Sequence, residues 1–135
     1  MIYLRIRKRF SAAHKLYNED WSVEKNKSVY GKCANPNFHG HNYVLFITVV
    51  GNVDPAYGFV MNKVDIDEIV GKAIIDKLDH YNLNVDVDFL KGQRTTVENI
   101  AKAIWRELDP LITTGKLHCI ELHETENIAA FYYGN

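Results

Sequence analysis

The chain has 135 residues, a formal net charge of −1 and 47% hydrophobic residues. This length allows one domain with a real core, and we expect residues 1–135 to form a single domain. The near-neutral charge provides no field that would attract nucleic acid or an anionic membrane, and no window approaches the ~18 uninterrupted apolar residues of a membrane span. The two cysteines, Cys33 in a polar stretch and Cys119 in an apolar one, do not suggest a disulfide framework. We therefore expect a cytoplasmic protein that binds neither nucleic acid nor membrane.

The first third of the chain contains two predicted strands. Apolar and polar residues alternate over residues 2–14, and residues 41–52 hold an almost continuous apolar run closed by Gly51 and Asn52. A basic run from Arg5 to Arg9 alternates within the first strand, which indicates a solvated or subunit-facing edge; a patch for triphosphate or nucleic acid is the alternative. The polar stretch between the strands, about residues 17–38, lacks periodicity and is predicted to be a functional or mobile loop.

Two helices are predicted next. The first opens at Asp65, with Glu68 three residues later as in a capping box, and its apolar residues recur at helical spacing up to Leu78. The second follows Thr95-Thr96-Val97-Glu98, where Thr95 and Glu98 form a capping box, and ends at Asp109-Pro110.

The last part of the chain alternates again over residues 117–125 and 128–134, which are predicted to form a hairpin through Glu126-Asn127. The order of elements is therefore strand, strand, helix, helix, strand, strand. This order indicates an antiparallel α+β fold with the helices on one face of the sheet.

One thiol and two imidazoles lie within nine positions, at Cys33, His39 and His41. In an extended strand, His39 and His41 project to the same face about two residue rises, ~6.6 Å, apart. His14 ends the first alternating stretch, so it can enter the same cluster from a neighbouring strand.

Three neutral imidazoles with an open fourth position are typical of a catalytic zinc site. Cys33 is a candidate fourth ligand, because a turn over residues 34–38 either folds the thiol back onto the metal or holds it nearby. Each histidine alone is as readily a core or surface residue. Their combination with Cys33 favours a metal centre.

Further candidate groups lie outside this cluster. Asp79 can orient His80 if the two are hydrogen-bonded, although both residue types are also favoured at a helix end. Glu124 ends an otherwise apolar strand face, so its carboxylate needs donors such as the two adjacent N–H groups of a pterin or guanine; a solvent-facing position near the hairpin tip is the alternative. Three other residues are interpreted as packing or surface residues, namely His118, Cys119 and His123.

The chain resembles the 6-pyruvoyl-tetrahydropterin synthase family, which also contains the 6-carboxy-tetrahydropterin synthases of queuosine biosynthesis. The resemblance runs from Phe10 to the last hairpin and is carried by Cys33-x5-His39-Gly40-His41-Asn42-Tyr43, Leu78-Asp79-His80, Thr96-x-Glu98-Asn99 and Glu124-Thr125-Glu126-Asn127. It implies the tunnelling fold, in which a four-stranded antiparallel sheet carries two helices. It also implies trimers that close into a barrel, usually two trimers in a hexamer, and sites between subunits.

The resemblance also implies a role for each candidate residue. The zinc ligands would be His14, His39 and His41. Cys33 would be the catalytic thiol and not a ligand, with Asp79 and His80 as its partners. Glu124 would anchor the pterin, and Thr96 would help to seat it. The implied reaction is a zinc-dependent conversion of 7,8-dihydroneopterin triphosphate to 6-pyruvoyl-tetrahydropterin with loss of triphosphate.

Three alternatives remain open at this point. In the first, the same site yields 6-carboxy-tetrahydropterin and acetaldehyde. The long spacer between Cys33 and His39, together with Gly58-Phe59-Val60-Met61-Asn62, favours the pyruvoyl branch instead. Phe38 departs from the small residue often found directly before His-Gly-His in that branch. A noncatalytic, zinc-stabilised pterin or purine binding module is the second. A metallohydrolase that uses zinc-bound water is the third.

Overall fold

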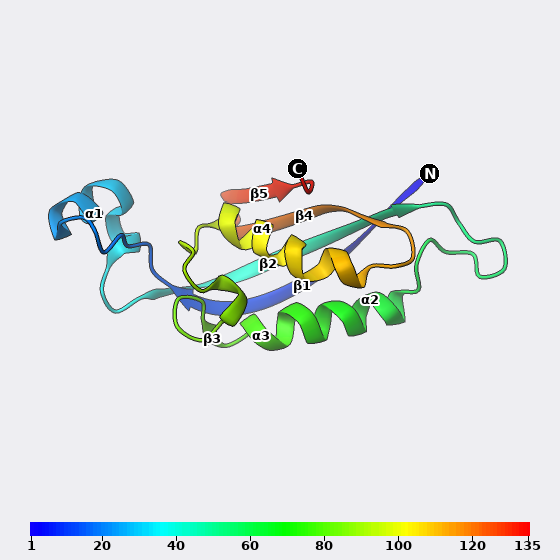
Figure 1. Cartoon of the computed structure of the whole chain (residues 1–135), viewed down its shortest axis with the longest axis horizontal. Helices are drawn as coiled ribbons and strands as arrows, with labels where there is room; N and C mark the ends of the chain where they lie inside the picture. Colours follow the sequence, from blue (N-terminus) through cyan, green and yellow to red (C-terminus); the bar gives the residue numbers. More distant parts are fainter.

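One five-stranded sheet, in the order β3-β1-β2-β4-β5, forms the centre of the molecule (Figure 1). The computed structural model describes all 135 residues. The strands are β1 (Ile2–His14), β2 (His39–Gly51), β3 (Tyr81–Asn82), β4 (Lys116–Thr125) and β5 (Ile128–Tyr132). The two long strands pair antiparallel over their whole length, from Ile2 opposite Gly51 to His14 opposite His39. This register brings both histidines to one end of the sheet.

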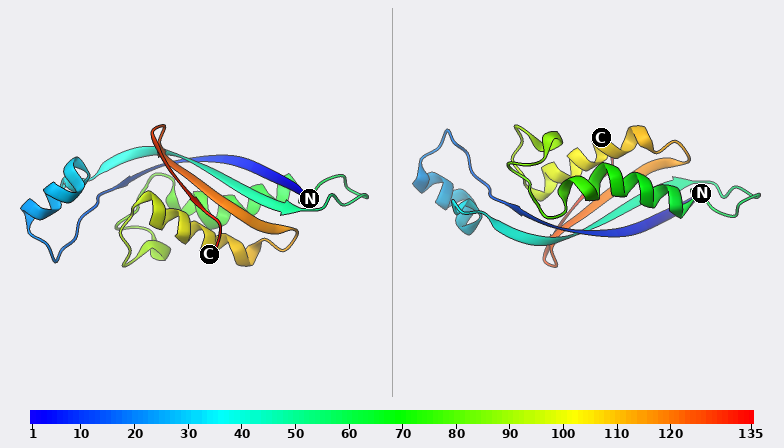
Figure 2. Two further views of the ribbon diagram at one scale, coloured as in Figure 1. Left: turned by 90° about the horizontal axis from the view of Figure 1, so that it is seen from above. Right: turned by 90° about the horizontal axis from the view of Figure 1, so that it is seen from below.

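Three helices, α2 (Lys63–Val70), α3 (Asp76–Leu78) and α4 (Val97–Leu108), cover one face of this sheet (Figure 2). The helix α1 (Val23–Tyr30) lies beyond the end of the long strands, and short 3₁₀ turns lie at Gly31–Ala34, Asp88–Leu90 and Asp109–Leu111. A π-helical turn, Gly71–Ile75, joins α2 to α3 in one helical stretch. None of the helices has the length and apolar character needed to cross a membrane.

The hydrophobic core lies between the sheet and the helices α2 to α4. It is one cluster of 26 buried residues, in which the inward-facing side chains of β2 meet the apolar stripe of α4. Leu45, Ile47, Ile100 and Ile104 are fully buried, and each such side chain contributes about 1.5–3 kcal/mol to folding. The core therefore holds β1 and β2, the strands that carry the histidines, in place against the helices.

The α+β class predicted from the sequence is confirmed, but the expected four-stranded antiparallel sheet with two helices in the order ββααββ is wrong. The fifth strand, β3, pairs parallel to β1 at Ala12 and Ala13, and its two residues are too few for any periodicity to reveal. The helix α1 lies inside the segment predicted as a loop. Its only buried residue is the polar Asn26, so no apolar stripe marked it as a helix.

The predicted starts of both helices also shift. Asn62 caps α2 by accepting a hydrogen bond from the Val64 N–H at 3.0 Å, so the helix begins before Asp65. Thr96 rather than Thr95 caps α4, accepting from the Asn99 N–H at 3.2 Å. Since Thr95 is not the cap, its side chain is available to the interior.

Candidate metal centre and active site

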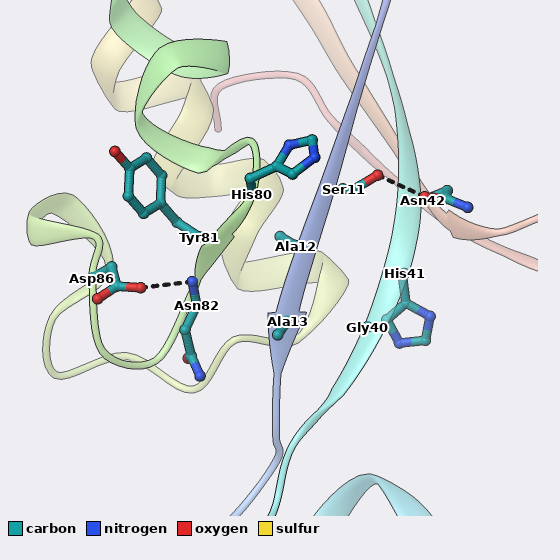
Figure 3. A pocket seen from close by; sticks show the side chains of 10 residues that line it. All are labelled: Ser11, Ala12, Ala13, Gly40, His41, Asn42, His80, Tyr81, Asn82 and Asp86. Carbon is teal, nitrogen blue, oxygen red and sulfur yellow. Dashed lines mark hydrogen bonds between the residues drawn. The ribbon is translucent and has the colours of Figure 1, made fainter.

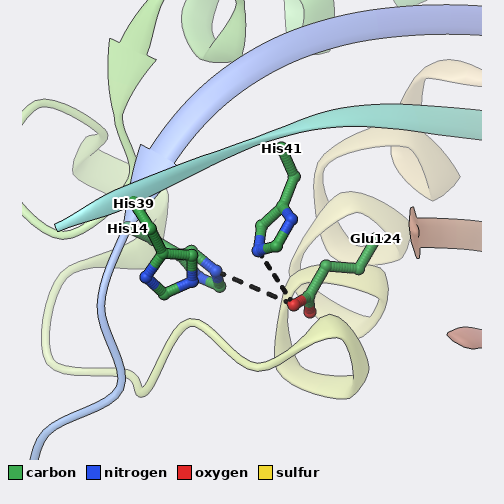
Figure 4. A group of neighbouring side chains, drawn as sticks. All are labelled: His14, His39, His41 and Glu124. Atoms are coloured by element: carbon green, nitrogen blue, oxygen red, sulfur yellow. Dashed lines mark ion pairs between the residues drawn. The ribbon is translucent and has the colours of Figure 1, made fainter. Parts of the chain in front are cut away.

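The ends of β1 and β2 bring the three predicted histidines together (Figure 4). The ring centroids of His14 and His39 are 4.6 Å apart, those of His39 and His41 are 4.9 Å apart, and those of His14 and His41 are 5.1 Å apart. The side chains share a face because His39 and His41 alternate along β2 and His14 lies directly opposite His39.

A carboxylate from β4 completes this group. Ligand atoms of His14, His39, His41 and Glu124 all lie within 4.8 Å of one another. The Oε1 atom of Glu124 is 3.1 Å from Nε2 of His41 and 3.9 Å from Nε2 of His14. The group therefore presents three imidazoles and one carboxylate to a common volume.

The imidazoles of the group are neutral at pH 7. Burial lowers the pKa of His14 to about 4 and lowers the pKa values of His39 and His41 as well. Burial raises the pKa of Glu124, so these contacts are weaker than a pair of full charges would be. Four imidazole nitrogens are buried without a hydrogen-bond partner: Nε2 of His14, both nitrogens of His39 and Nε2 of His41. Neutral imidazole lone pairs in that setting fit a divalent cation.

Thr95 is a member of the site that the sequence analysis missed. The Nδ1–H of His14 donates to the Thr95 carbonyl at 2.8 Å, and the Thr95 hydroxyl lies 3.2 Å from the same nitrogen. This contact leaves Nε2 of His14 as the nitrogen that carries the lone pair. The only signal in the sequence was the pair of threonines before α4, and the capping-box interpretation assigned Thr95 to the helix instead.

Cys33 lies near Glu124 but outside the group of four. Its carbonyl accepts a hydrogen bond from the Leu16 N–H at 2.8 Å, which ties the 3₁₀ turn after α1 to the chain just beyond His14. Burial and then the nearby Glu124 charge raise the pKa of the half-buried Cys33 thiol. The thiol is thus mostly protonated at pH 7 and needs help to act as a base.

Asp79 and His80 form the predicted carboxylate–imidazole pair, with Oδ2 of Asp79 3.0 Å from Nδ1 of His80. Ser11 of β1 holds both residues: its N–H donates to Asp79 Oδ1 at 2.9 Å, and its carbonyl accepts from the His80 N–H at 2.6 Å. His80 has a positive φ of 65°, and its side chain is 82% exposed. The pair is therefore anchored at its backbone and open at its imidazole.

This pair is not bonded to the histidine–carboxylate group of its own chain. The His80 imidazole borders an open cavity of about 550 Å³ that Ser11, Asn82 and His41 also line (Figure 3). Asp79 and His80 form their hydrogen bonds with Ser11 and their ion pair with each other, and none of these reaches Cys33 or the histidine–carboxylate group. Within one chain the Asp79–His80 pair is therefore not bonded to the thiol or to the three histidines.

The remaining candidates lie elsewhere. Thr96 is half-buried at the start of α4 and is engaged there as the helix cap. His123 contacts Glu121, with 2.6 Å between Nε2 and Oε2, and Cys119 is buried. None of these residues belongs to the metal-binding group.

The fold and the site define an α+β protein whose sheet end presents three histidines and a carboxylate that could hold a metal ion. Residues 3–135 match the model of the family described as 6-pyruvoyl tetrahydropterin synthase. The chain is 43% identical over 125 residues to a 6-pyruvoyl tetrahydrobiopterin synthase from Homo sapiens, covering 93% of this chain and 86% of the relative.

A relative of the same name from Dictyostelium discoideum is 43% identical over 133 residues, covering 98% of this chain and 96% of the relative. The solved structure of Caenorhabditis elegans 6-pyruvoyl tetrahydropterin synthase matches with a TM-score of 0.93 at 34% identity, covering 99% of this chain and 96% of that one. The chain therefore belongs to the 6-pyruvoyl tetrahydropterin synthase family, and the resemblance found from its motifs is confirmed.

Proposed function

We propose that this protein is a zinc-dependent lyase that converts 7,8-dihydroneopterin triphosphate to 6-pyruvoyl-tetrahydropterin with loss of triphosphate. The observation that carries the proposal is the cluster of neutral, unpartnered imidazoles beside the Cys33 thiol. It occurs in a chain 36–44% identical to relatives named 6-pyruvoyl tetrahydrobiopterin synthase. The names of these relatives favour the pyruvoyl product over the carboxy product.

The metal ligands in this proposal are His14, His39 and His41, whose free nitrogens converge. Zinc is the proposed ion because imidazole suits it and because three histidines leave a position for a substrate oxygen. When bound, zinc supplies Lewis-acid stabilisation of negative charge on the substrate's side-chain oxygens.

Glu124 is the proposed anchor for the pterin ring. Its side chain is only 13% exposed, and the polar partners it has within 4 Å are the His14 and His41 imidazoles, so its capacity to accept hydrogen bonds is largely unused. Two adjacent N–H groups on a pterin edge fit a carboxylate in a bidentate manner. Thr96, at the start of α4, is proposed to help seat the same ring.

A substitution of Glu124 separates this anchor role from a role as a fourth metal ligand. If Glu124 anchors the pterin, Glu124→Ala keeps its zinc and loses affinity for a dihydropterin. Zinc loss equal to that of a His41→Ala variant would assign the carboxylate to the metal instead.

Cys33 is the proposed general base, which removes a proton from the pterin side chain before triphosphate leaves. Tautomerisation then moves oxidation state from the ring to the side chain, so no external redox cofactor is needed. Asp79 orients His80, and His80 exchanges the proton with the thiol. This role requires the thiol and the imidazole to meet, which they do not do within one chain.

A homo-oligomer with shared sites satisfies that requirement. The sheet ends at β5 on one side, and on the other side β1 has a strand partner only at Ala12 and Ala13. Unpaired strand edges are templates for pairing with another copy. We propose trimers that close the sheets into a barrel, two trimers to a hexamer, with the exposed Asp79–His80 pair facing the Cys33 of a neighbouring copy.

The test is incubation of the zinc-loaded protein with 7,8-dihydroneopterin triphosphate, followed by mass analysis of all products. We expect 6-pyruvoyl-tetrahydropterin and triphosphate in equal amounts. Acetaldehyde together with 6-carboxy-tetrahydropterin would replace the proposed product, and an unchanged substrate would refute the enzymatic function.

A further inference from the structure

Tyr43 is a fully buried residue of β2, two positions after His41. Its ring stacks on Phe10, with centroids 4.8 Å apart and planes inclined by 11°. It also lies edge-on to His41 and His14, at centroid distances of 5.6 and 6.1 Å. The ring is therefore held in one orientation beside the metal-binding group.

The hydroxyl of Tyr43 is buried and has no hydrogen-bond partner. The buried side-chain atoms without partners in this protein belong to four residues: His14, His39, His41 and Tyr43. A metal ion accounts for the imidazole nitrogens. It does not account for a neutral phenol, since protein zinc sites take Cys, His, Asp and Glu ligands. An unpartnered buried hydroxyl destabilises a fold, so its presence requires an explanation.

The surroundings of the hydroxyl show what kind of partner it lacks. Glu124 and Cys33 both lie near Tyr43, yet the hydroxyl is hydrogen-bonded to neither. A divalent ion held by the group would take up the imidazole lone pairs, which would then not serve as acceptors. An oxygen atom of a ligand bound at the same centre fits the hydroxyl as its acceptor.

We propose that Tyr43 is a substrate-binding residue, whose hydroxyl donates a hydrogen bond to a side-chain oxygen of the bound dihydropterin. Glu124 lies near this phenol and is the proposed pterin anchor, so a pterin held there lies beside the hydroxyl. The proposal rests on the proposed function, because it takes a dihydropterin with side-chain oxygens as the ligand. It adds a residue that distinguishes pterins with side-chain oxygens from pterins without them.

The test compares Tyr43→Phe with the unchanged protein, both loaded with zinc, using two ligands. The first is 7,8-dihydroneopterin, which has side-chain oxygens, and the second is 7,8-dihydropterin, which has none. We expect the variant to bind the first about 10-fold more weakly and the second with unchanged affinity. Its kcat/KM on the triphosphate should fall by a similar factor. Zinc content should be unchanged, and the melting temperature should be equal or higher because an unpartnered hydroxyl has been removed.

Tyr57→Phe is the matched control, since this phenol is 72% exposed in the loop after β2, and it should change none of these values. Equal affinities of Tyr43→Phe and the unchanged protein for 7,8-dihydroneopterin would overturn the proposal, as would equal losses for both ligands. If the unchanged protein neither binds the dihydropterins nor turns over the triphosphate, the proposed function itself fails. Turnover with no effect of Tyr43→Phe defeats only this inference.

Discussion

Cys33 and His39 lie six positions apart in the chain but have different surroundings. Both nitrogens of His39 are buried without partners, whereas the thiol lies outside the group of atoms that can share one ion. We expect Cys33→Ala to keep its zinc and to lose turnover by about 10²–10⁴-fold, the usual contribution of a general base. His39→Ala should lose both zinc and turnover. Metal analysis and steady-state rates on the purified variants measure the two effects.

The control for this pair is Cys119→Ala, which removes the other free cysteine and should leave zinc content and rate unchanged. Equal zinc loss in Cys33→Ala and His39→Ala would show that the thiol is a ligand. The proposed proton transfer through Cys33 would then be wrong.

Protonation of the buried histidines makes the stability of the metal-free protein depend on pH. Burial lowers the pKa of His14 from its ordinary value of 6.5 to about 4, so between these values the unfolded chain binds more protons than the folded one. The stabilising contribution is therefore complete above pH 6.5 and is lost as the pH falls towards 4. For His14 it corresponds to about 3 kcal/mol of the free energy of unfolding.

Urea unfolding in the presence of a chelator, at several pH values from 7 down to 4, measures this dependence. His14→Asn removes the titrating group while keeping a side chain that can donate to the Thr95 carbonyl, so its unfolding free energy should change less over the same range. A slope identical to that of the unchanged protein would show that other groups cause the loss.

At the level of elements, the sequence predicted the helices and strands that have a periodic pattern of apolar residues. The long strands, the stretch from α2 to α3, α4 and the last hairpin all carry alternating or helical apolar patterns, and all are present. The shared face of His39 and His41 could be predicted for the same reason, because alternate residues of a strand point to the same side. By contrast, α1 depends on two polar residues. Ser22 caps it by accepting a hydrogen bond from the Lys25 N–H at 3.0 Å, and Asn26 is buried within it. Neither residue produces a periodic apolar pattern.

Asn26 is the residue that holds this unpredicted segment. It is 1% exposed, its Oδ1 accepts from the Asn18 N–H at 2.7 Å, and its Nδ2 donates to the carbonyls of Asn18 and Ser22 at 2.9 and 3.0 Å. We expect Asn26→Ala to destabilise the segment from Asn18 to Cys33 by about 1–3 kcal/mol, since backbone groups lose their partners. Hydrogen exchange should show faster exchange there and little change in β1 and β2.

Loosening of this segment would displace the Cys33 thiol at its end. Turnover of Asn26→Ala should therefore fall while its zinc content is retained. Asn99→Ala is a suitable comparison, because this side chain also donates to a backbone carbonyl, that of Arg94 at 2.9 Å, but at the start of α4. Unchanged exchange between residues 18 and 33 in Asn26→Ala would show that the segment is held by other contacts.

For the whole molecule, the sequence could place the three histidines together but not the relation of the Asp79–His80 pair to them. The histidines follow from strand parity within two neighbouring strands. The position of Asp79 and His80 depends on the end of α3 at Leu78 and on the hydrogen bonds of both residues to Ser11 of β1, which are a matter of tertiary packing. The result is a pair at one margin of the sheet whose imidazole is directed away from its own chain's core.

The proposed shared site predicts that two inactive variants restore each other. Cys33→Ala lacks the thiol and His80→Ala lacks the imidazole, so each pure oligomer should have little activity. In an equal mixture of the two chains, about a quarter of the interfaces place an intact Cys33 next to an intact His80, because both neighbours must be of the required kind. Coexpression should therefore give about a quarter of the activity of the unchanged protein, with native mass spectrometry showing that oligomers are mixed. Mixed oligomers that stay inactive would place thiol and imidazole in the same chain's site, and the exposed position of His80 would then need another explanation.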